Sequence, residues 1–297
     1  LLSLFKFREA LVNKIPSNLK FAITAGIGLF IAIIALLNAN VVVASESTTV
    51  ALGELSSPTV VLSLVGLLII GALQHYKVPG GILLGILITW VLGIMAQLVG
   101  WYVPNPDAGV YSVIPQFSLS SFEAPKMFQF DFGFIAKNVP AFILIVFTFL
   151  YTDIFDTVGT LIGVAEKGKL LDKDGSLPNA TGALMADAVG TVVGACFGTS
   201  TVTSYVESSA GVAAGGRTGL TAVTTAVLFF ISLIFAPIFT SIPSFATTPA
   251  MLYVGLLMLS SIRQVKFDGD IADAIGAFLA IIMMPLTYSI ANGIMFG

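Results

Sequence analysis

Long apolar intervals without a charged residue restrict the fold of this chain more than any other feature. Several are about 20 residues long, which is enough for a helix to cross the hydrocarbon core of a bilayer. Only 10% of the 297 residues are charged, against about 25% in soluble domains. We therefore expect an all-α polytopic membrane protein. The predicted spans are 21–45, 55–74, 78–101, 139–165, a helix opened by Pro178 with its span starting near Ala186, two spans within 218–262 broken near Pro237, Pro243 and Pro249, and a pair of short helices within 271–297 interrupted by Pro285.

The distribution of basic residues agrees with these spans. If the residues before the first span are cytoplasmic and each span reverses the side, 11 of the 13 Lys and Arg residues face inward, and only Lys126 and Lys137 face outward. Such a division follows the positive-inside rule. It predicts a multi-pass protein of the cell membrane, in bacteria the plasma membrane. The scheme also requires 186–216 to cross and return, which is too short for two full helices and indicates an irregular segment.

Two aspartates, Asp153 and Asp156, lie in the middle of the otherwise uncharged interval 139–165. An acidic side chain at the centre of a membrane helix costs about 2.5–3.5 kcal/mol on insertion scales, so it is rarely kept without a function. Residues three apart share one helix face. A third acid, Glu207, follows in the irregular segment. We expect the function to depend on these three carboxylates.

The irregular segment alternates Thr199, Thr201, Thr203 and Tyr205, a strand-like period of two. Glycines precede and follow it. An extended stretch at membrane depth is tolerated only where it is buried in protein or lines a cavity, and transporters use such broken helices at the bilayer midplane. Glu207 is predicted in the first turn after the stretch. The alternative is a Ser/Thr-rich helix whose hydroxyls bond to their own backbone.

Three segments carry a resemblance to a known family: 151–160 (YTDIFDTVGT), 198–219 (GTSTVTSYVESSAGVAAGGRTG) and 283–293 (MMPLTYSIANG). They resemble AzgA-type purine permeases, which are proton-coupled importers of adenine, guanine and hypoxanthine within the nucleobase–ascorbate transporter group. The resemblance implies a uracil-permease-like inverted-repeat fold of fourteen segments. Segments 1–4 and 8–11 form a core, and segments 5–7 and 12–14 form a gate. Segments 3 and 10 each contain a short strand beside the substrate.

Mapped on that plan, 1–136 is a gate half with segments 5–7 and an outer loop. Residues 137–245 form a core half with segments 8–11, and 246–297 form a truncated gate half with segments 12–14. The N-terminal core segments are then missing, so we expect the chain to be a fragment of a larger permease. The resemblance also implies a homodimer formed through the gate.

The resemblance assigns roles to residues. Asp153 accepts hydrogen bonds from the purine and takes part in proton coupling, and Asp156 serves proton coupling or holds its segment. Glu207 contacts the substrate. Hydroxyl and backbone donors, and aromatic rings that either stack on the base or only pack, complete the predicted site: Thr201, Thr203, Ser204, Tyr205 and Phe155. Asp187 is expected near the cytoplasmic end of segment 9, where it caps or pairs.

The leading interpretation is a secondary-active importer of purine nucleobases driven by proton symport. The base binds at the midplane between segments 8 and 10, and the core moves against the gate. One alternative is an anion transporter or exchanger of the same fold, although three acids suit an anion poorly. Another is an intramembrane aspartyl enzyme, but such dyads come from facing helices. With one His and one Cys, no His/Cys metal cluster is expected. No cofactor is expected, and a net charge of −3 without a basic patch indicates no nucleic-acid partner.

Overall fold

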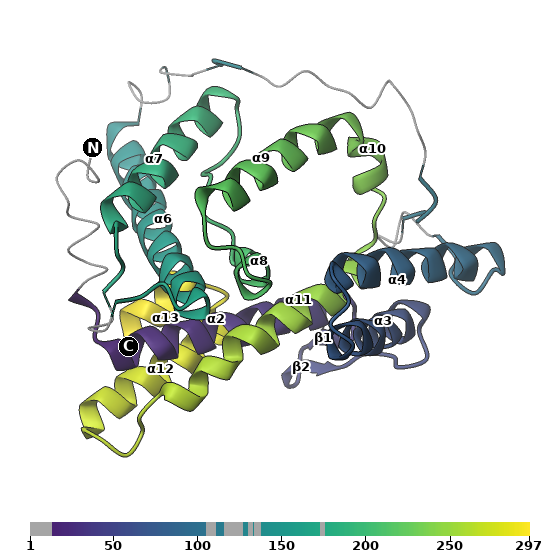
Figure 1. The fold of residues 1–297 in the computed structure, drawn as a ribbon, viewed down its shortest axis with the longest axis horizontal. Coiled ribbons are helices and arrows are strands. Elements are labelled where there is room, and N and C mark those ends of the chain that lie inside the picture. The colour runs from purple at the N-terminus through teal and green to yellow at the C-terminus, as the bar shows by residue number, and fades with distance from the viewer. Residues whose placement is uncertain (1–13, 105–110, 116–126, 130–132, 134–137, 173–175) are drawn as a thin grey trace. The chain divides into compact units, whose positions relative to one another are not determined.

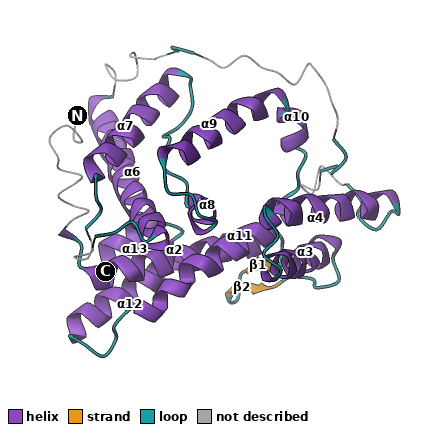
Figure 2. Cartoon of the chain, in the orientation of Figure 1, coloured by secondary structure: helices purple, strands orange, loops and turns teal. Residues whose placement is uncertain are grey.

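The computed structural model describes residues 14–104, 111–115, 127–129, 133, 138–172 and 176–297. They fall into two compact units. Unit 1 contains the described residues of Leu1–Phe30, Glu123–Gly216 and Leu257–Gly297, and unit 2 contains those of Ile31–Phe122 and Arg217–Leu256. The described residues are mostly helical, with one short hairpin (Figure 2).

The elements follow one another along the chain as labelled in Figure 1. They are α2 (Ser17–Asn38), β1 (Val42–Ser45), β2 (Thr49–Leu52), α3 (Pro58–His75), α4 (Gly81–Leu98), α6 (Val139–Gly168), α7 (Ala180–Cys196), α8 (Ser208–Ala213), α9 (Gly219–Ile234), α10 (Ala236–Phe239), α11 (Ser244–Leu259), η3 (Ser260–Gln264), α12 (Ile271–Thr287) and α13 (Ile290–Phe296). Among the described residues, five helices are long and apolar enough to cross a membrane: α2, α3, α4, α6, and α11 continued by η3. This composition supports the prediction of a polytopic helical membrane protein.

The first predicted span is wrong at its C-terminal end, and the fold is not purely α-helical. Helix α2 ends at Asn38, and the following residues form the antiparallel pair β1–β2, in which Val42 lies opposite Leu52. The β-branched run 41–43 and the second run at 49–50 flank a short polar turn, and β-branched residues favour strands. The predicted span 21–45 includes the first of these runs because the run is apolar.

Only some of the prolines in the predicted breaks lie at a helix end. Pro237 lies in the short α10 after the break from α9, and Pro243 lies just before α11, so both expected boundaries are confirmed. Pro249 and Pro285 lie inside α11 and α12, so the breaks expected there are wrong. Membrane helices tolerate proline because neighbouring groups satisfy the freed carbonyl. The two short helices expected at 271–297 do form, but they separate at Tyr288, whose φ is 53°.

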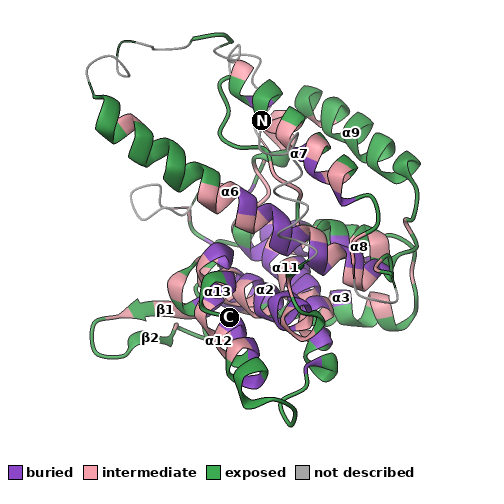
Figure 3. Cartoon of the chain, turned by 90° about the vertical axis from the view of Figure 1, so that its left-hand side faces the viewer, coloured by how far each residue is buried: buried purple, intermediate pink, exposed green. Residues whose placement is uncertain are grey.

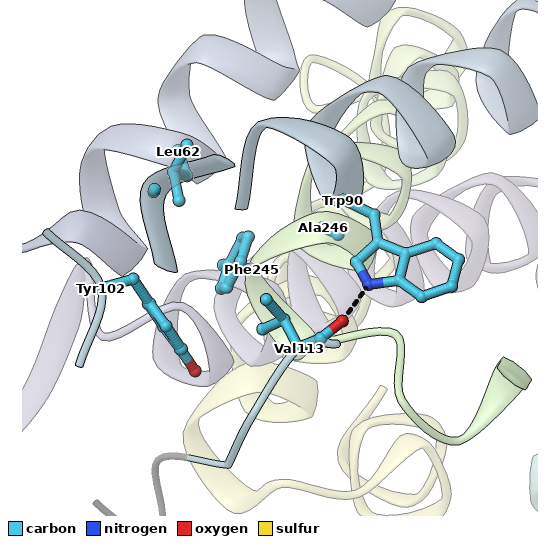
Figure 4. Packing of buried hydrophobic residues seen from close by; sticks show 7 residues of the cluster. Leu62, Trp90, Tyr102, Val113, Phe245 and Ala246 are labelled. Atoms are coloured by element: carbon cyan, nitrogen blue, oxygen red, sulfur yellow. Dashed lines mark hydrogen bonds between the residues drawn. The ribbon is translucent and has the colours of Figure 1, made fainter. Parts of the chain in front are cut away.

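Unit 2 has a core of large side chains, shown in Figure 4. Trp90 of α4 donates its indole N–H to the carbonyl of Val113 at 2.8 Å. The rings of Tyr102 and Phe245 pack with their centroids 5.6 Å apart, and the Tyr102 hydroxyl donates to the carbonyl of Tyr111. The core thus combines apolar burial with hydrogen bonds that satisfy its polar atoms.

Unit 1 packs through small residues. A Cβ placed on Gly26 of α2 would lie 2.8 Å from Met284 Sδ of α12, so the two helices approach closely there. On α6, Ile154, Val158 and Ile162 recur every four residues and form a buried cluster with Leu184 of α7. This spacing places all three on one face of α6. The cluster fixes the C-terminal half of α6 against α7.

Candidate functional site

Helix α6 changes its surroundings at its centre. Its 30 residues span about 45 Å at 1.5 Å per residue. Residues 143–150 are exposed, whereas most of 151–168 are buried or half-buried, and Figure 3 shows this change along the helix. Asp153 and Asp156, both half-buried, lie where the exposed half meets the packed half. The two carboxylates are therefore in the middle of the helix, as expected.

Asp156 links α6 to the beginning of α13. The backbone N–H of Ala291, in the first turn of α13, is directed at the Asp156 carboxylate, and the charge of Asp153 is close enough to interact with it. The break at Tyr288 makes this possible, because a new helix starts there with unbonded N–H groups. Ser289 accepts from the N–H of Asn292 at 3.2 Å. This geometry favours a role for Asp156 in holding its segment and is also compatible with coupling.

Asp187 is the residue that the sequence interpretation misplaced. It lies in the middle of α7, not near an end, and is 7% exposed. The hydroxyl of Thr157 on α6 lies 3.2 Å from both carboxylate oxygens of Asp187, to which it donates. The pairing role expected for Asp187 is confirmed, and its expected position is wrong. Thr157 directly follows Asp156, so the Asp187 carboxylate contacts α6 next to Asp153 and Asp156.

The irregular segment interrupts the helices as expected. After α7, Gly198 has a φ of 76°, and residues 199–205 form neither helix nor paired strand. The carbonyl of Val202 accepts from the Thr191 hydroxyl on α7 at 2.9 Å. A Cβ on Gly194 would lie 2.6 Å from Val202 and 2.8 Å from Thr199. The expected strand does not form, because the stretch folds back onto α7 instead of pairing with another strand.

The predicted substrate-binding residues of this segment differ in exposure. Thr203 and Ser204 are half-buried, whereas Thr201 and Tyr205 are exposed. Glu207 is the residue immediately before α8, which confirms its expected place in the chain. Its side chain is exposed and forms no hydrogen bond or ion pair with another described residue.

Helix α8 returns the chain to α6. The two helices contact each other, and a Cβ on Gly168 of α6 would lie 2.7 Å from Val212 of α8. In the described part of the chain, however, no hydrogen bond joins Glu207 to Asp153 or Asp156. A binding site shared by the three acids therefore stays a prediction.

Phe155 packs within the protein. It lies against the cluster of Ile154, Val158, Ile162 and Leu184, and its ring centroid is 4.7 Å from that of Tyr151. These contacts favour the packing role over stacking on a base. For metal binding, the described residues contain no group of three or more His, Cys, Asp or Glu side chains arranged to hold an ion.

Several buried polar atoms have no hydrogen-bond partner among the described residues. They include the hydroxyl of Tyr151, Oδ1 of Asp156 and the hydroxyl of Ser209. They lie on α6 and α8, the helices that carry or border the predicted site. Buried polar groups are nearly always satisfied, so each such atom needs a water, a ligand or another protein group. Their positions support a polar binding function on these two helices.

Comparison with known proteins agrees with this reading. The family model described as the permease family (Xan_ur_permease) matches residues 1–296. A putative permease of Methanocaldococcus jannaschii is 43% identical over 297 residues, covering 100% of this chain and 65% of its own length. The adenine permease AdeQ of Escherichia coli is 40% identical, and the guanine/hypoxanthine permease PbuG of Bacillus subtilis is 41% identical; each match covers 100% of this chain and 64% of the relative.

The chain thus spans slightly less than two thirds of the length of these relatives. The relatives are transporters and not enzymes, and the match extends over all three motifs on which the resemblance to purine permeases was based. The chain belongs to this permease family of multi-pass membrane transporters.

Proposed function

We propose that the protein imports purine nucleobases by proton symport. The observation that carries the proposal is the set of partnerless polar atoms on α6 and α8, on or near the acids of the family motifs. A purine presents ring N–H donors and ring nitrogen acceptors, so a carboxylate and hydroxyls are suitable partners. The names of the adenine and guanine/hypoxanthine permeases among the relatives support the same substrate class.

In the proposed site, Asp153 accepts from the base, and Glu207 with Thr201, Thr203 and Ser204 approaches it from the irregular segment. Asp156 exchanges the coupled proton while it keeps its contact with Ala291. The base binds at the bilayer midplane, and the core moves against the gate to alternate access, in an assembly that forms a homodimer through the gate. An anion transporter of the same fold would need positive charge at this position, and the motif supplies carboxylates instead.

The test uses full-length protein in membrane vesicles. Uptake of radiolabelled adenine is measured against unlabelled adenine, guanine, hypoxanthine, uracil, ascorbate and sulfate, with and without a protonophore. Purines should compete, the other compounds should not, and the protonophore should abolish accumulation. Competition by sulfate alone would favour the anion transporter instead.

The matched variants are Asp153→Asn and Glu54→Gln. Both replace a carboxylate with an amide, but Glu54 is exposed in unit 2 and only accepts from Ser56. Asp153→Asn should reduce purine uptake by at least about 100-fold, or about 2.7 kcal/mol, at normal membrane abundance, and Glu54→Gln should leave it unchanged. Normal uptake by Asp153→Asn would remove Asp153 from the binding site.

A further inference from the structure

A pocket of about 570 Å³ lies at the far end of α6 from the exposed half, between that helix, the start of α2 and η3. Its volume is within the roughly 300–1,000 Å³ typical of small-molecule sites. Its described charged lining consists of three lysines and two acids: Lys20, Lys167, Lys169, Glu166 and Asp172. The positive-inside division of the sequence assigns all three lysines to the cytoplasmic side.

Two of these lysines are withdrawn from solvent. Lys20 is 3% exposed, and the side chain of Lys167 is 14% exposed. Lysine is rarely buried so deeply, because removing its charge from water is costly. Lys169, just after α6, is exposed and completes the basic lining. One buried and one half-buried lysine beside a pocket form a more defined site than lysines on an open surface.

The buried carboxylate of this pocket is already well satisfied. Glu166 accepts from the Ser261 hydroxyl and from the Gln264 side chain, both at 2.7 Å. It also lies 3.6 Å from the Lys167 ammonium, which in turn donates to Ser260 at 2.7 Å. Two neutral donors therefore stabilise the Glu166 carboxylate. The described lining keeps one more positive than negative charge.

The helix at the other wall adds to this field. Ser17, the first residue of α2, lines the pocket, so the positive end of the α2 dipole faces it. Phe21, one turn further along α2, supplies an apolar surface. Basic pockets between helices on the cytoplasmic side of membrane proteins are typical sites for phosphate head groups.

We propose that this pocket binds a phosphate-bearing anion at the cytoplasmic face, separately from the purine site. The anion is either the head group of an anionic phospholipid or a soluble phosphate compound, since both present the same chemistry to lysine. Another reading is that Lys167 and Lys169 only compensate the carbonyls at the end of α6. The two readings differ in one respect: compensation alone makes the stability of the protein independent of phosphate.

The experiment measures thermal unfolding of purified full-length protein in two arms. The first adds inorganic phosphate in detergent, against chloride at equal ionic strength. The second compares nanodiscs of phosphatidylglycerol with nanodiscs of phosphatidylcholine. The variants are K167Q/K169Q and, because Lys169 is exposed and safe to change, K169Q alone. The control is K14Q/K77Q, which removes two cytoplasmic charges outside the pocket.

Phosphate or phosphatidylglycerol should raise Tm of the wild type and of K14Q/K77Q by about 3 °C or more, as expected for a filled site in a chain of this size. The shift should be lost in K167Q/K169Q and reduced in K169Q. A shift in detergent identifies a soluble phosphate as the source, and a shift only in nanodiscs identifies a lipid head group. Equal shifts in K167Q/K169Q and wild type, or no shift in either arm, would overturn the proposal. Because purine uptake is not measured, the result is independent of the proposed transport function.

Discussion

The two units treat their buried polar side chains differently. In unit 2, Trp90, Tyr102 and Thr89 each donate to a backbone carbonyl, and the core around them is aromatic and aliphatic. In unit 1, the hydroxyls of Tyr151 and Ser209 and one oxygen of Asp156 have no partner among the described residues. These buried polar groups of unit 2 are therefore satisfied within the fold, whereas those of unit 1 are open to a water or a ligand.

This difference separates stability from function. A group that is satisfied within the fold stabilises it, and its loss costs free energy of unfolding. A buried polar group without a partner costs about 1–3 kcal/mol, so a water, a ligand or another protein group is expected to satisfy it. Paired substitutions of the same chemical type, one in each unit, can therefore test whether unit 1 carries the site.

After Asp153→Asn, the largest effect on transport is expected from Asp156→Asn in unit 1. It removes the group proposed to exchange the coupled proton and weakens the interaction with the Ala291 N–H, so purine transport should fall at least about tenfold, or 1.4 kcal/mol. Equilibrium binding of the purine should fall less than transport. Glu54→Gln in unit 2 should change neither. Uptake and equilibrium binding are measured on the same vesicles, and an equal loss of both would argue against a coupling role.

Thr157→Val should destabilise unit 1 by about 1–3 kcal/mol, because the buried Asp187 loses the hydrogen bond that Thr157 donates. Thr89→Val in unit 2 is the matched change. The Thr89 hydroxyl only donates to the carbonyl of Gly85 in its own helix, so about 0.5 kcal/mol or less should be lost. Thermal unfolding in detergent checks both values. Equal destabilisation by the two variants would mean that the hydrogen bond from Thr157 to Asp187 stabilises the fold no more than a hydrogen bond within one helix.

Gly194→Ala and Gly93→Ala add a methyl group at two tightly packed positions. At Gly194 the new Cβ would push away Val202 and Thr199, and at Gly93 it would enter the ring of Phe245. Overpacking costs about 1–3 kcal/mol, so both should lower Tm. Only Gly194→Ala should also weaken purine binding, because it displaces the irregular segment.

The control for this pair is Gly190→Ala on α7, where Val202 would lie at an ordinary 3.7 Å. It should leave both Tm and purine affinity close to those of the wild type. If Gly93→Ala weakened purine binding as strongly as Gly194→Ala, the assignment of the site to unit 1 would be wrong.

The smallest expected effects come from Tyr151→Phe and Tyr102→Phe. Tyr102 loses its hydrogen bond to Tyr111, at about 1 kcal/mol, whereas Tyr151 loses a hydroxyl without a described partner and should be near neutral in stability. Purine uptake should fall only in Tyr151→Phe. Unchanged uptake in Tyr151→Phe would mean that the Tyr151 hydroxyl has no role in transport.

The Tyr102 phenol also predicts an alkaline dependence. Burial raises the pKa of Tyr102 above its ordinary value of 10.0. A raised pKa in the folded state means that the stabilisation is fully present below pH 10 and is lost as the pH rises through the folded pKa. Unfolding measured from neutral pH upward should therefore show a decline in Tm above about pH 10 that is smaller in Tyr102→Phe. An identical decline in the wild type and in Tyr102→Phe would mean that other groups cause the loss of Tm.

The sequence predicts best what depends on local composition. Apolar length locates α3, α4 and α6 within a few residues, and the alternating threonines locate the break after α7. The hairpin β1–β2 was not predicted because valine is both apolar and β-branched. The run 41–43 therefore fits a membrane span and a strand equally well. The breaks predicted at Pro249 and Pro285 were wrong because membrane helices tolerate the lost hydrogen bond.

Contacts between distant residues could not be read from the sequence. Thr157 and Asp187 are 30 residues apart, and their pairing depends on how Ile154, Val158 and Ile162 seat α6 against Leu184. The contact of Ala291 with Asp156 depends on a single left-handed residue, Tyr288. The acids themselves were predictable because charge in an apolar run is conspicuous, whereas their partners are ordinary residues in ordinary helices.

Helix α6 is unbroken from Val139 to Gly168. It therefore acts as a rod that carries two carboxylates at its midpoint and a lysine-lined pocket at one end. A base at the proposed midpoint site and an anion in the proposed pocket would therefore contact the same continuous helix. Thermodynamic reciprocity then requires any anion that tightens the hold on the base to be held more tightly by the same factor when the base is present. If the proposed pocket and the proposed base site are coupled in this way, the supply of phosphate compounds or acidic lipid would shift the base concentration at which the permease is half-filled.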